Sequence, residues 1–267
     1  MNFLSVLVLA IIQGFTEFLP VSSSAHLVFG KALLGVREEG VALEVVLHLG
    51  TLLAVLIYYR DDLLSLLRGA IDELGPRGLA GNRQSLQMIG YLVIGTIPAV
   101  VGAVFIKDYV EAGFNNPRGS SLELLINGVM LLSTLLAAKG RASLGAVRAL
   151  VIGIAQFISI LPGISRSGAT IGAALFMKIK PEEAARFSFL MSIPAILGAA
   201  VFELGPMIEG LRSGNLGLYA FGFVISFFTG LLAIDVLLRV VQRGRFALFG
   251  VYCVVVGLFG LWFFRGN

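Results

Sequence analysis

Six long apolar segments limit what this chain can fold into. Each is close to the roughly 20 residues that an α-helix needs to cross a bilayer. No water is available there to bind exposed N–H and C=O groups, so such a segment must be helical. The segments occupy residues 42–59, 86–106, 122–138, 186–203, 217–238 and 246–264. We therefore expect an all-α polytopic membrane protein with six transmembrane helices in one membrane domain, 1–267.

Composition agrees with the bilayer as the solvent of this chain. Hydrophobic residues make up 57% of the 267 positions and charged residues only 13%, against about 25% charged residues in soluble domains. The net charge is +4, but the basic residues are scattered over short loops, as is usual in membrane proteins. This distribution argues against nucleic-acid binding. Cys253 is the only cysteine, so no internal disulfide can form.

Two further apolar segments, 1–35 and 147–180, are interrupted in the middle. Pro20 and Pro162 each follow an apolar stretch that is too short to span, and small polar residues come next. Non-helical backbone at membrane depth is stable only where protein buries it or water reaches it. Each segment is therefore predicted to be a re-entrant helical hairpin.

Loop charges predict the orientation of these elements. The loops at 60–85, 139–148 and 239–245 are rich in Arg and Lys, which places them in the cytoplasm. The first hairpin then enters from outside and the second from inside. Residues 1–138 and 147–264 would thus form an inverted-topology repeat, each half a hairpin followed by three spans. The two hairpin tips would meet near the midplane.

The hairpins also resemble each other in sequence. Residues 7–13 and 150–156 are apolar stretches that end in Gln13 and Gln156, and each hairpin continues to a Leu-Pro pair followed by serines. This internal similarity supports the predicted repeat.

The first hairpin carries ionisable side chains, which are costly at membrane depth and mark candidate functional sites. Gln13 and Glu17 are four residues apart and share one helix face. After the break, Ser22 or Ser23 lies one turn from His26, which suits nucleophile activation or proton transfer. The alternative is a polar seam that ties helices together.

The second hairpin places hydroxyl groups and an arginine where a new helix would begin. Ser165, Arg166, Ser167 and Thr170 follow the Pro-Gly turn. Free N–H groups at a helix N-terminus bind anions, and a guanidinium adds a fork that matches phosphate oxygens. We interpret this tip as a phosphate-binding site. The alternative is that Arg166 only neutralises Glu17 in a structural ion pair.

Two other ionisable residues are assigned structural roles. His48 lies in an apolar helix and is interpreted as a helix-packing or interfacial residue. Asp235 has Arg239 one turn further on, which predicts a contact at a helix end.

At the two tips the sequence resembles the bacterial undecaprenyl-diphosphate phosphatase family, the bacitracin-resistance proteins. The first family signature is Glu or Gln, Glu four residues later, then Leu-Pro-Val-Ser-Ser and a His, matched from Gln13 to His26. The second, Pro-Gly-x-Ser-Arg-Ser-x-x-Thr, is matched from Pro162 to Thr170. Both occur in the family's order, and the length and span pattern match over essentially the whole chain.

This resemblance implies an activity. The enzyme would hydrolyse undecaprenyl diphosphate to undecaprenyl phosphate and inorganic phosphate, which recycles the lipid carrier for cell-wall synthesis. It would lie in the bacterial inner membrane with a site that opens to the periplasm. The expected partners are the polyprenyl diphosphate lipid and the bilayer, and the sequence leaves a homo-oligomer open. The main alternative is a polyprenyl-phosphate transporter or flippase, because inverted repeats with half-helices at the midplane are a transporter architecture.

The resemblance also implies roles for individual residues. Glu17 and Gln13 would hold a divalent cation, Mg²⁺ or Ca²⁺, although some relatives have Glu in place of Gln13 and so one more anionic ligand. Ser23 and His26 would carry nucleophilic attack or proton transfer, and the sequence leaves open whether Ser23 is phosphorylated or orients water. The phosphate would be bound by Arg166 with Ser165, Ser167 and Thr170.

Overall fold

The computed structural model of this chain is helical throughout the part that it describes. That part comprises residues 2–36, 42–74, 83–113, 116–138, 140–161, 163–213 and 215–265, and it contains no β-strand. The helices are α1 (Phe3–Phe18), α2 (Ser23–Leu34), α3 (Ala42–Tyr58), α4 (Arg60–Leu74), α5 (Arg83–Gly113), α6 (Pro117–Ser133), η1 (Thr134–Leu136), α7 (Ala146–Ile158), α8 (Arg166–Phe176), α9 (Pro181–Phe202), α10 (Leu204–Ser213), α11 (Leu216–Gln242) and α12 (Leu248–Phe263).

The all-α prediction is confirmed, and each of the six apolar segments forms a helix: α3, α5, α6, α9, α11 and α12. Among the described residues, α5, α6 together with η1, α9 and α11 are long and apolar enough to cross a membrane. A fifth candidate is the pair of α3 and α4, which is bent by 69°. α12 is equally apolar but only 16 residues long.

Two helices lie in segments that the sequence analysis left as loops. α4 begins at Arg60, inside the loop predicted at 60–85, and α10 lies in the connection between the predicted spans at 186–203 and 217–238. The loop assignment is wrong for both. Asp61 and Asp62 stand in the first turn of α4, where carboxylates favour the helix dipole. Neither helix has the length of an apolar span, so the search for such spans did not identify them.

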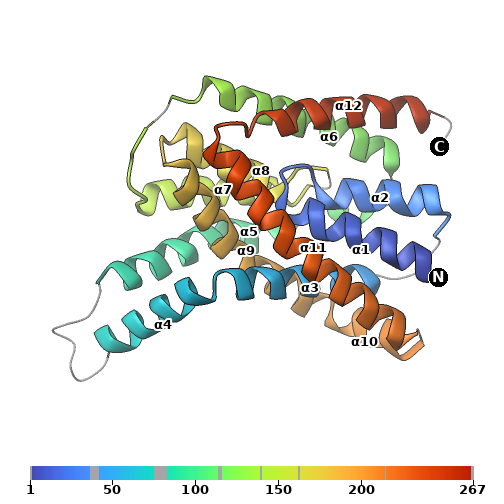
Figure 1. The fold of residues 1–267 in the computed structure, drawn as a ribbon, viewed down its shortest axis with the longest axis horizontal. Coiled ribbons are helices and arrows are strands. Elements are labelled where there is room, and N and C mark those ends of the chain that lie inside the picture. The colour runs from blue at the N-terminus through green and yellow to red at the C-terminus, as the bar shows by residue number, and fades with distance from the viewer. Residues whose placement is uncertain are drawn as a thin grey trace.

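Both interrupted segments are helical hairpins. α1 ends at Phe18 and α2 begins at Ser23, while α7 ends at Ile158 and α8 begins at Arg166. Pro162 lies outside the described residues, but the following Gly163 has a φ of 97°, which suits glycine. Figure 1 shows α1 and α2 extending to the right and α7 and α8 lying to the left, so that the two breaks meet in the middle.

The two halves of the chain interlock. α1 packs along α11, and α7 packs along α5, so the first helix of each hairpin rests on a span from the other half. α6 and α12 lie side by side (Figure 1). These helices approach closely at small residues: a side chain at Gly14 would collide with Thr229, and one at Gly153 with the backbone of Gly95. Such contacts are typical of helices packed in lipid.

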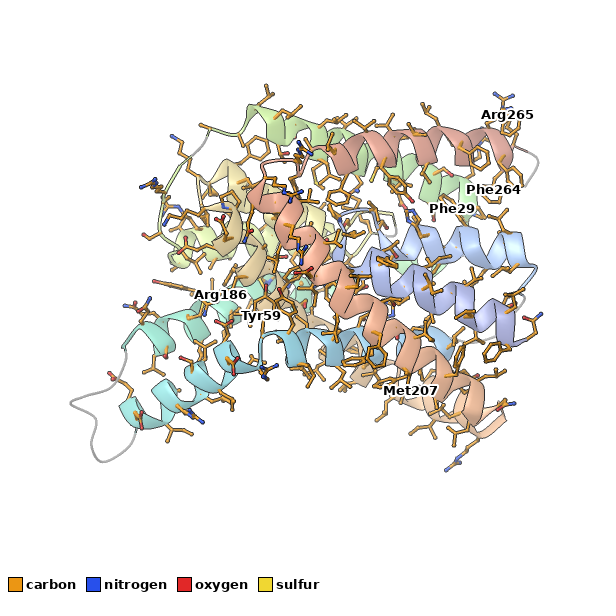
Figure 2. The ribbon with its side chains drawn as sticks, viewed as in Figure 1. Phe29, Tyr59, Arg186, Met207, Phe264 and Arg265 are labelled. Carbon is orange, nitrogen blue, oxygen red and sulfur yellow. The ribbon has the colours of Figure 1, made fainter. Side chains whose placement is uncertain are left out.

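The outer surface of the bundle is apolar. Phe228, Val255 and Trp262 are exposed, as are many other large apolar side chains. Figure 2 shows side chains projecting outward from the helices and labels Phe29 and Phe264, whose stacked rings join α2 to the end of α12. An apolar surface of this extent is unusual for a protein in water and fits a lipid environment.

Candidate active site at the two hairpin breaks

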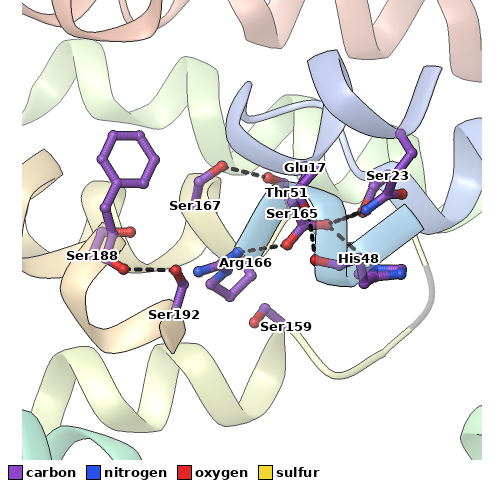
Figure 3. A network of polar contacts seen from close by, with 12 residues as sticks. Glu17, Ser23, His48, Thr51, Ser159, Ser165, Arg166, Ser167, Ser188 and Ser192 are labelled. Carbon is purple, nitrogen blue, oxygen red and sulfur yellow. Dashed lines mark hydrogen bonds and ion pairs between the residues drawn. The ribbon is translucent and has the colours of Figure 1, made fainter. Parts of the chain in front are cut away.

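Glu17 is the centre of a polar network where the hairpins meet (Figure 3). It is buried in the last turn of α1. Its Oε1 accepts a hydrogen bond from Arg166 Nη2 at 2.6 Å. Its Oε2 accepts bonds from Gln13 Nε2 at 3.0 Å and from Ser23 Oγ at 2.9 Å. The carboxylate thus connects the signature residues of both hairpins, which the sequence analysis had identified as candidates.

Arg166 is the first residue of α8, and its side chain is only 14% exposed. Nη2 is bound to Glu17, but Nη1 is buried and has no hydrogen-bond partner among the described protein groups. A buried charged donor without an acceptor is costly. The guanidinium therefore has one nitrogen fixed by the carboxylate and one suited to an oxygen of an incoming anion.

The start of α8 adds further donors beside Arg166. The Ser165 hydroxyl caps the helix by accepting a bond from Gly168 N at 3.1 Å, and it lies 3.1 Å from Ser167 Oγ. Both serines are buried. Unpaired N–H groups and the positive end of the helix dipole favour an anion at such a terminus.

Thr170 is fully buried one turn further along α8. Its hydroxyl donates to the Arg166 carbonyl at 2.7 Å and lies 2.6 Å from Ser188 Oγ of α9. Its predicted role in phosphate binding stays a prediction, because the structure engages this hydroxyl with protein partners.

His26 lies in α2 and faces α12. Its Nδ1 is 2.8 Å from the Ser22 carbonyl, and its Nε2 is 2.8 Å from the hydroxyl of Tyr252. No hydrogen bond joins His26 to Ser23 within the described hairpin, since Ser23 donates to Glu17 instead. Ser23 and His26 are close in sequence, but Ser23 hydrogen-bonds to Glu17 and His26 to Tyr252.

His48 reaches the site from α3, where the sequence analysis assigned it a packing role. Its Nε2 lies 3.5 Å from Glu17 Oε2. The sequence did contain a signal, since a histidine at membrane depth is itself a functional candidate. Spacing along α3 could not show which distant side chain it would meet.

Asn127 is the other residue that sequence reasoning missed. It is fully buried in α6, donates to the Pro20 carbonyl at 3.0 Å and accepts a bond from Ser165 N at 3.0 Å. One side chain therefore holds the breaks of both hairpins. A further bond, from Gly163 N to Ser24 Oγ at 3.1 Å, joins the two breaks directly.

Asp235 and Arg239 form the predicted helix-end contact. Their side chains lie 2.8 Å apart on α11, and both are exposed. The pair lies outside the polar network around Glu17, as the sequence analysis expected.

The residues around Glu17 suit a divalent cation. Gln13 is fully buried, and its Oε1 has no partner among the described protein groups. Amide, carboxylate and hydroxyl oxygens are the ligands that Mg²⁺ and Ca²⁺ prefer. Within the described residues no cluster of three His, Cys, Asp or Glu exists. A cation here would therefore need oxygens from a phosphate substrate as well, which is common for Mg²⁺.

Known proteins resemble this chain over nearly its full length. A family profile described as bacitracin resistance protein BacA matches residues 6–259. A protein of Salinibacter ruber named undecaprenyl-diphosphatase is 40% identical over 269 residues, covering 98% of this chain and 99% of that protein. Proteins of the same name from Korarchaeum cryptofilum and Alcanivorax borkumensis are 41% and 40% identical, and each alignment covers 97% of this chain and 98% or 97% of the relative.

Proposed function

Because the chain belongs to the bacitracin resistance protein BacA family, we propose that it is a membrane undecaprenyl-diphosphatase. It hydrolyses undecaprenyl diphosphate to undecaprenyl phosphate and inorganic phosphate, which recycles the lipid carrier for cell-wall synthesis. The observation that carries this function is the buried guanidinium of Arg166, with Nη2 on Glu17 and Nη1 unpartnered at the start of α8.

The terminal phosphate binds at the N-terminus of α8. Arg166 Nη1 and the serines at the start of this helix, Ser165 and Ser167, supply the donors. Phosphoryl transfer needs little covalent chemistry from the protein, and its catalysis is mostly positioning and charge stabilisation. A guanidinium at this helix terminus performs both tasks.

Ser23 is the proposed nucleophile and Glu17 its base. The Ser23 hydroxyl already donates to Glu17 Oε2 at 2.9 Å. As Arg166 turns towards the phosphate, it frees Glu17 Oε1, which accepts the Ser23 proton, and Ser23 Oγ attacks the terminal phosphorus. Undecaprenyl phosphate leaves, and water then releases inorganic phosphate from the serine. His26 is the proposed proton donor to the departing lipid phosphate.

Glu17 and Gln13 would hold the divalent cation, Mg²⁺ or Ca²⁺, that the family resemblance implied. When bound, the cation supplies positive charge that offsets the charge developing on the transferred phosphate. Gln13 offers a neutral oxygen, so Glu17 is the only anionic ligand of this pair.

We further propose six membrane spans and two re-entrant hairpins in an inverted repeat, 1–138 and 147–264. The exchanged packing supports this arrangement, because α1 lies on α11 and α7 lies on α5, each in the opposite half. The third span of each half is α6 or α12. These two helices pack on each other, as elements related by such a pseudo-symmetry would.

The proposed location is the bacterial inner membrane, with the site open to the periplasm. In Figure 1, α4, the chain after α6 and the turn between α11 and α12 lie towards the left, and both termini and α10 lie towards the right. The left end carries the basic loops and would face the cytoplasm. The hairpin of α1 and α2 then enters from the periplasmic side.

Phosphate release from undecaprenyl diphosphate by the detergent-purified protein tests this function. We expect release that a chelator abolishes and that Arg166→Ala lacks. A folded protein that releases no phosphate but moves the lipid between leaflets would instead support the flippase alternative.

A further inference from the structure

We infer that His48 is a ligand of the divalent cation through its Nε2, together with Glu17 and Gln13. This inference rests on the proposed function and extends its cation site by one residue. It is drawn from the position of the imidazole, from the hydrogen bond that fixes its ring, and from the unpartnered oxygen of Gln13.

The imidazole of His48 is held beside Glu17 by the packing of α3. Gly50 lets α3 lie close to α11, since any side chain there would collide with Ser226 and with the backbone of Phe223. His48 Nε2 lies 3.5 Å from Glu17 Oε2 of α1 (Figure 3). The His48 side chain is 34% exposed, so its ring is not sealed inside the bundle.

The ring orientation leaves Nε2 as a lone-pair donor. Nδ1 lies 2.8 Å from the Glu44 carbonyl oxygen. A carbonyl only accepts, so Nδ1 carries the hydrogen, and in neutral imidazole Nε2 does not. In that neutral form the lone pair faces a carboxylate oxygen, and two acceptors at this distance gain nothing from each other. Metal-binding histidines commonly donate their other ring N–H to a backbone carbonyl in this way.

Gln13 supplies the third atom. Its Nε2 donates to Glu17 Oε2, while its Oε1 is buried without a partner among the described protein groups. A half turn of the amide exchanges the two atoms with little change in volume and directs Oε1 towards the same carboxylate oxygen. Glu17 Oε2, His48 Nε2 and Gln13 Oε1 then form a mixed oxygen and nitrogen set around one point.

An imidazole ligand changes which cation the site prefers. Ca²⁺ and Mg²⁺ bind oxygen ligands, whereas first-row transition cations accept imidazole nitrogen as well. We therefore expect this chain to bind Mn²⁺ more tightly than Ca²⁺. His48→Gln should weaken Mn²⁺ binding at least about tenfold, as disturbing the shell around a metal commonly does, and should affect Ca²⁺ binding less.

Electron paramagnetic resonance of bound Mn²⁺ tests this ligand directly. The chain has two histidines, His26 and His48, so a histidine nitrogen coupled to Mn²⁺ comes from one of them. Detergent-purified protein labelled with ¹⁴N- or ¹⁵N-histidine should show a nitrogen coupling that changes with the isotope. The coupling should persist in His26→Gln and vanish in His48→Gln. The labelled wild type and His26→Gln decide the matter even if His48→Gln does not fold.

The opposite result is equally clear. Mn²⁺ bound without histidine coupling, a coupling lost in His26→Gln, or no Mn²⁺ bound at all would overturn the inference and leave His48 as an ionic partner of Glu17. Phosphate release measured on the same samples separates this failure from that of the proposed function. A wild type that is active but lacks the coupling refutes only the His48 ligand.

Discussion

The two hairpins begin their second helices in the same way. Ser22 caps α2 by accepting a bond from Ala25 N, and Ser165 caps α8 by accepting one from Gly168 N. They differ in charge, since the first hairpin carries Glu17 at the end of its first helix and the second carries Arg166 at the start of its second. Similar breaks in the backbone therefore bring a carboxylate and a guanidinium to one point, where each offsets the cost of burying the other.

The two glutamines extend this comparison. Gln13 donates to Glu17, whereas neither amide atom of the equally buried Gln156 has a partner among the described protein groups. The first hairpin thus places an amide, a serine and a carboxylate together. The second hairpin contributes the guanidinium of Arg166 and the N-terminus of α8. The proposed function therefore assigns the proton and nucleophile chemistry to the first hairpin and phosphate binding to the second.

The largest effect is expected for Arg166→Ala. Loss of the guanidinium should lower kcat/KM for phosphate release by about 10³-fold or more, as removal of an arginine from a phosphoryl-transfer site does. Arg166→Lys is the matched control, because it keeps the charge but loses the fork, and it should recover only part of the rate. Initial rates on undecaprenyl diphosphate measure both. Near-normal activity of Arg166→Ala would refute the assignment of phosphate binding to the second hairpin.

Substituting one serine in each hairpin tests whether the first hairpin carries the chemistry and the second binds the substrate. Ser23→Ala should lower kcat at least about 10²-fold, because it removes the group that donates its proton to Glu17. Ser167→Ala should mainly raise KM, because Ser167 lies at the phosphate-binding helix terminus. Steady-state kinetics separate the two effects. Rapid quenching with terminally labelled substrate should trap phosphate on the wild type and none on Ser23→Ala.

Much of this arrangement could be predicted from local sequence. Apolar length predicts the six long helices, and the Leu-Pro pair with its serines predicts where the first hairpin breaks, at Pro20. Such signals act within one turn or one span of a helix. They predicted which residues are chemical candidates, and four of these, Gln13, Glu17, Ser23 and Arg166, do form the network in the structure.

Long-range pairing could not be predicted in the same way. Arg166 meets Glu17 across 149 positions of sequence, and His48 and Asn127 join the site from α3 and α6. An isolated histidine or amide in an apolar helix has the same local pattern whether it faces a site or a neighbouring helix. Only the packing of spans from both halves decides which of the two applies.

Asn127→Ala tests whether the two hairpins must be held in register. Ser165 N would lose its buried acceptor, which costs about 1–3 kcal/mol, while the Pro20 carbonyl would keep only the weaker thiol donor of Cys253. The misaligned tips should also slow phosphate release by up to about 10²-fold. Ser133→Ala on the same helix is the control, since within the described part of the chain the Ser133 hydroxyl bonds only to the Met130 carbonyl. Thermal unfolding in detergent and phosphate release measure the two effects. Equal behaviour of the two variants would show that Asn127 does not position the tips.

The smallest effect is expected at Thr170. Thr170→Val removes a bond to the helix backbone and also leaves the buried Ser188 hydroxyl without a partner, which costs about 1–3 kcal/mol. Thr96→Val removes only the bond to the Leu92 carbonyl and should cost about 0.5 kcal/mol or less. The difference in thermal unfolding between these variants therefore measures the link from α8 to α9. If Thr170→Val is as stable as Thr96→Val but has a strongly raised KM, then the Thr170 hydroxyl serves the phosphate. The second hairpin would in that case bind substrate one turn deeper than Arg166.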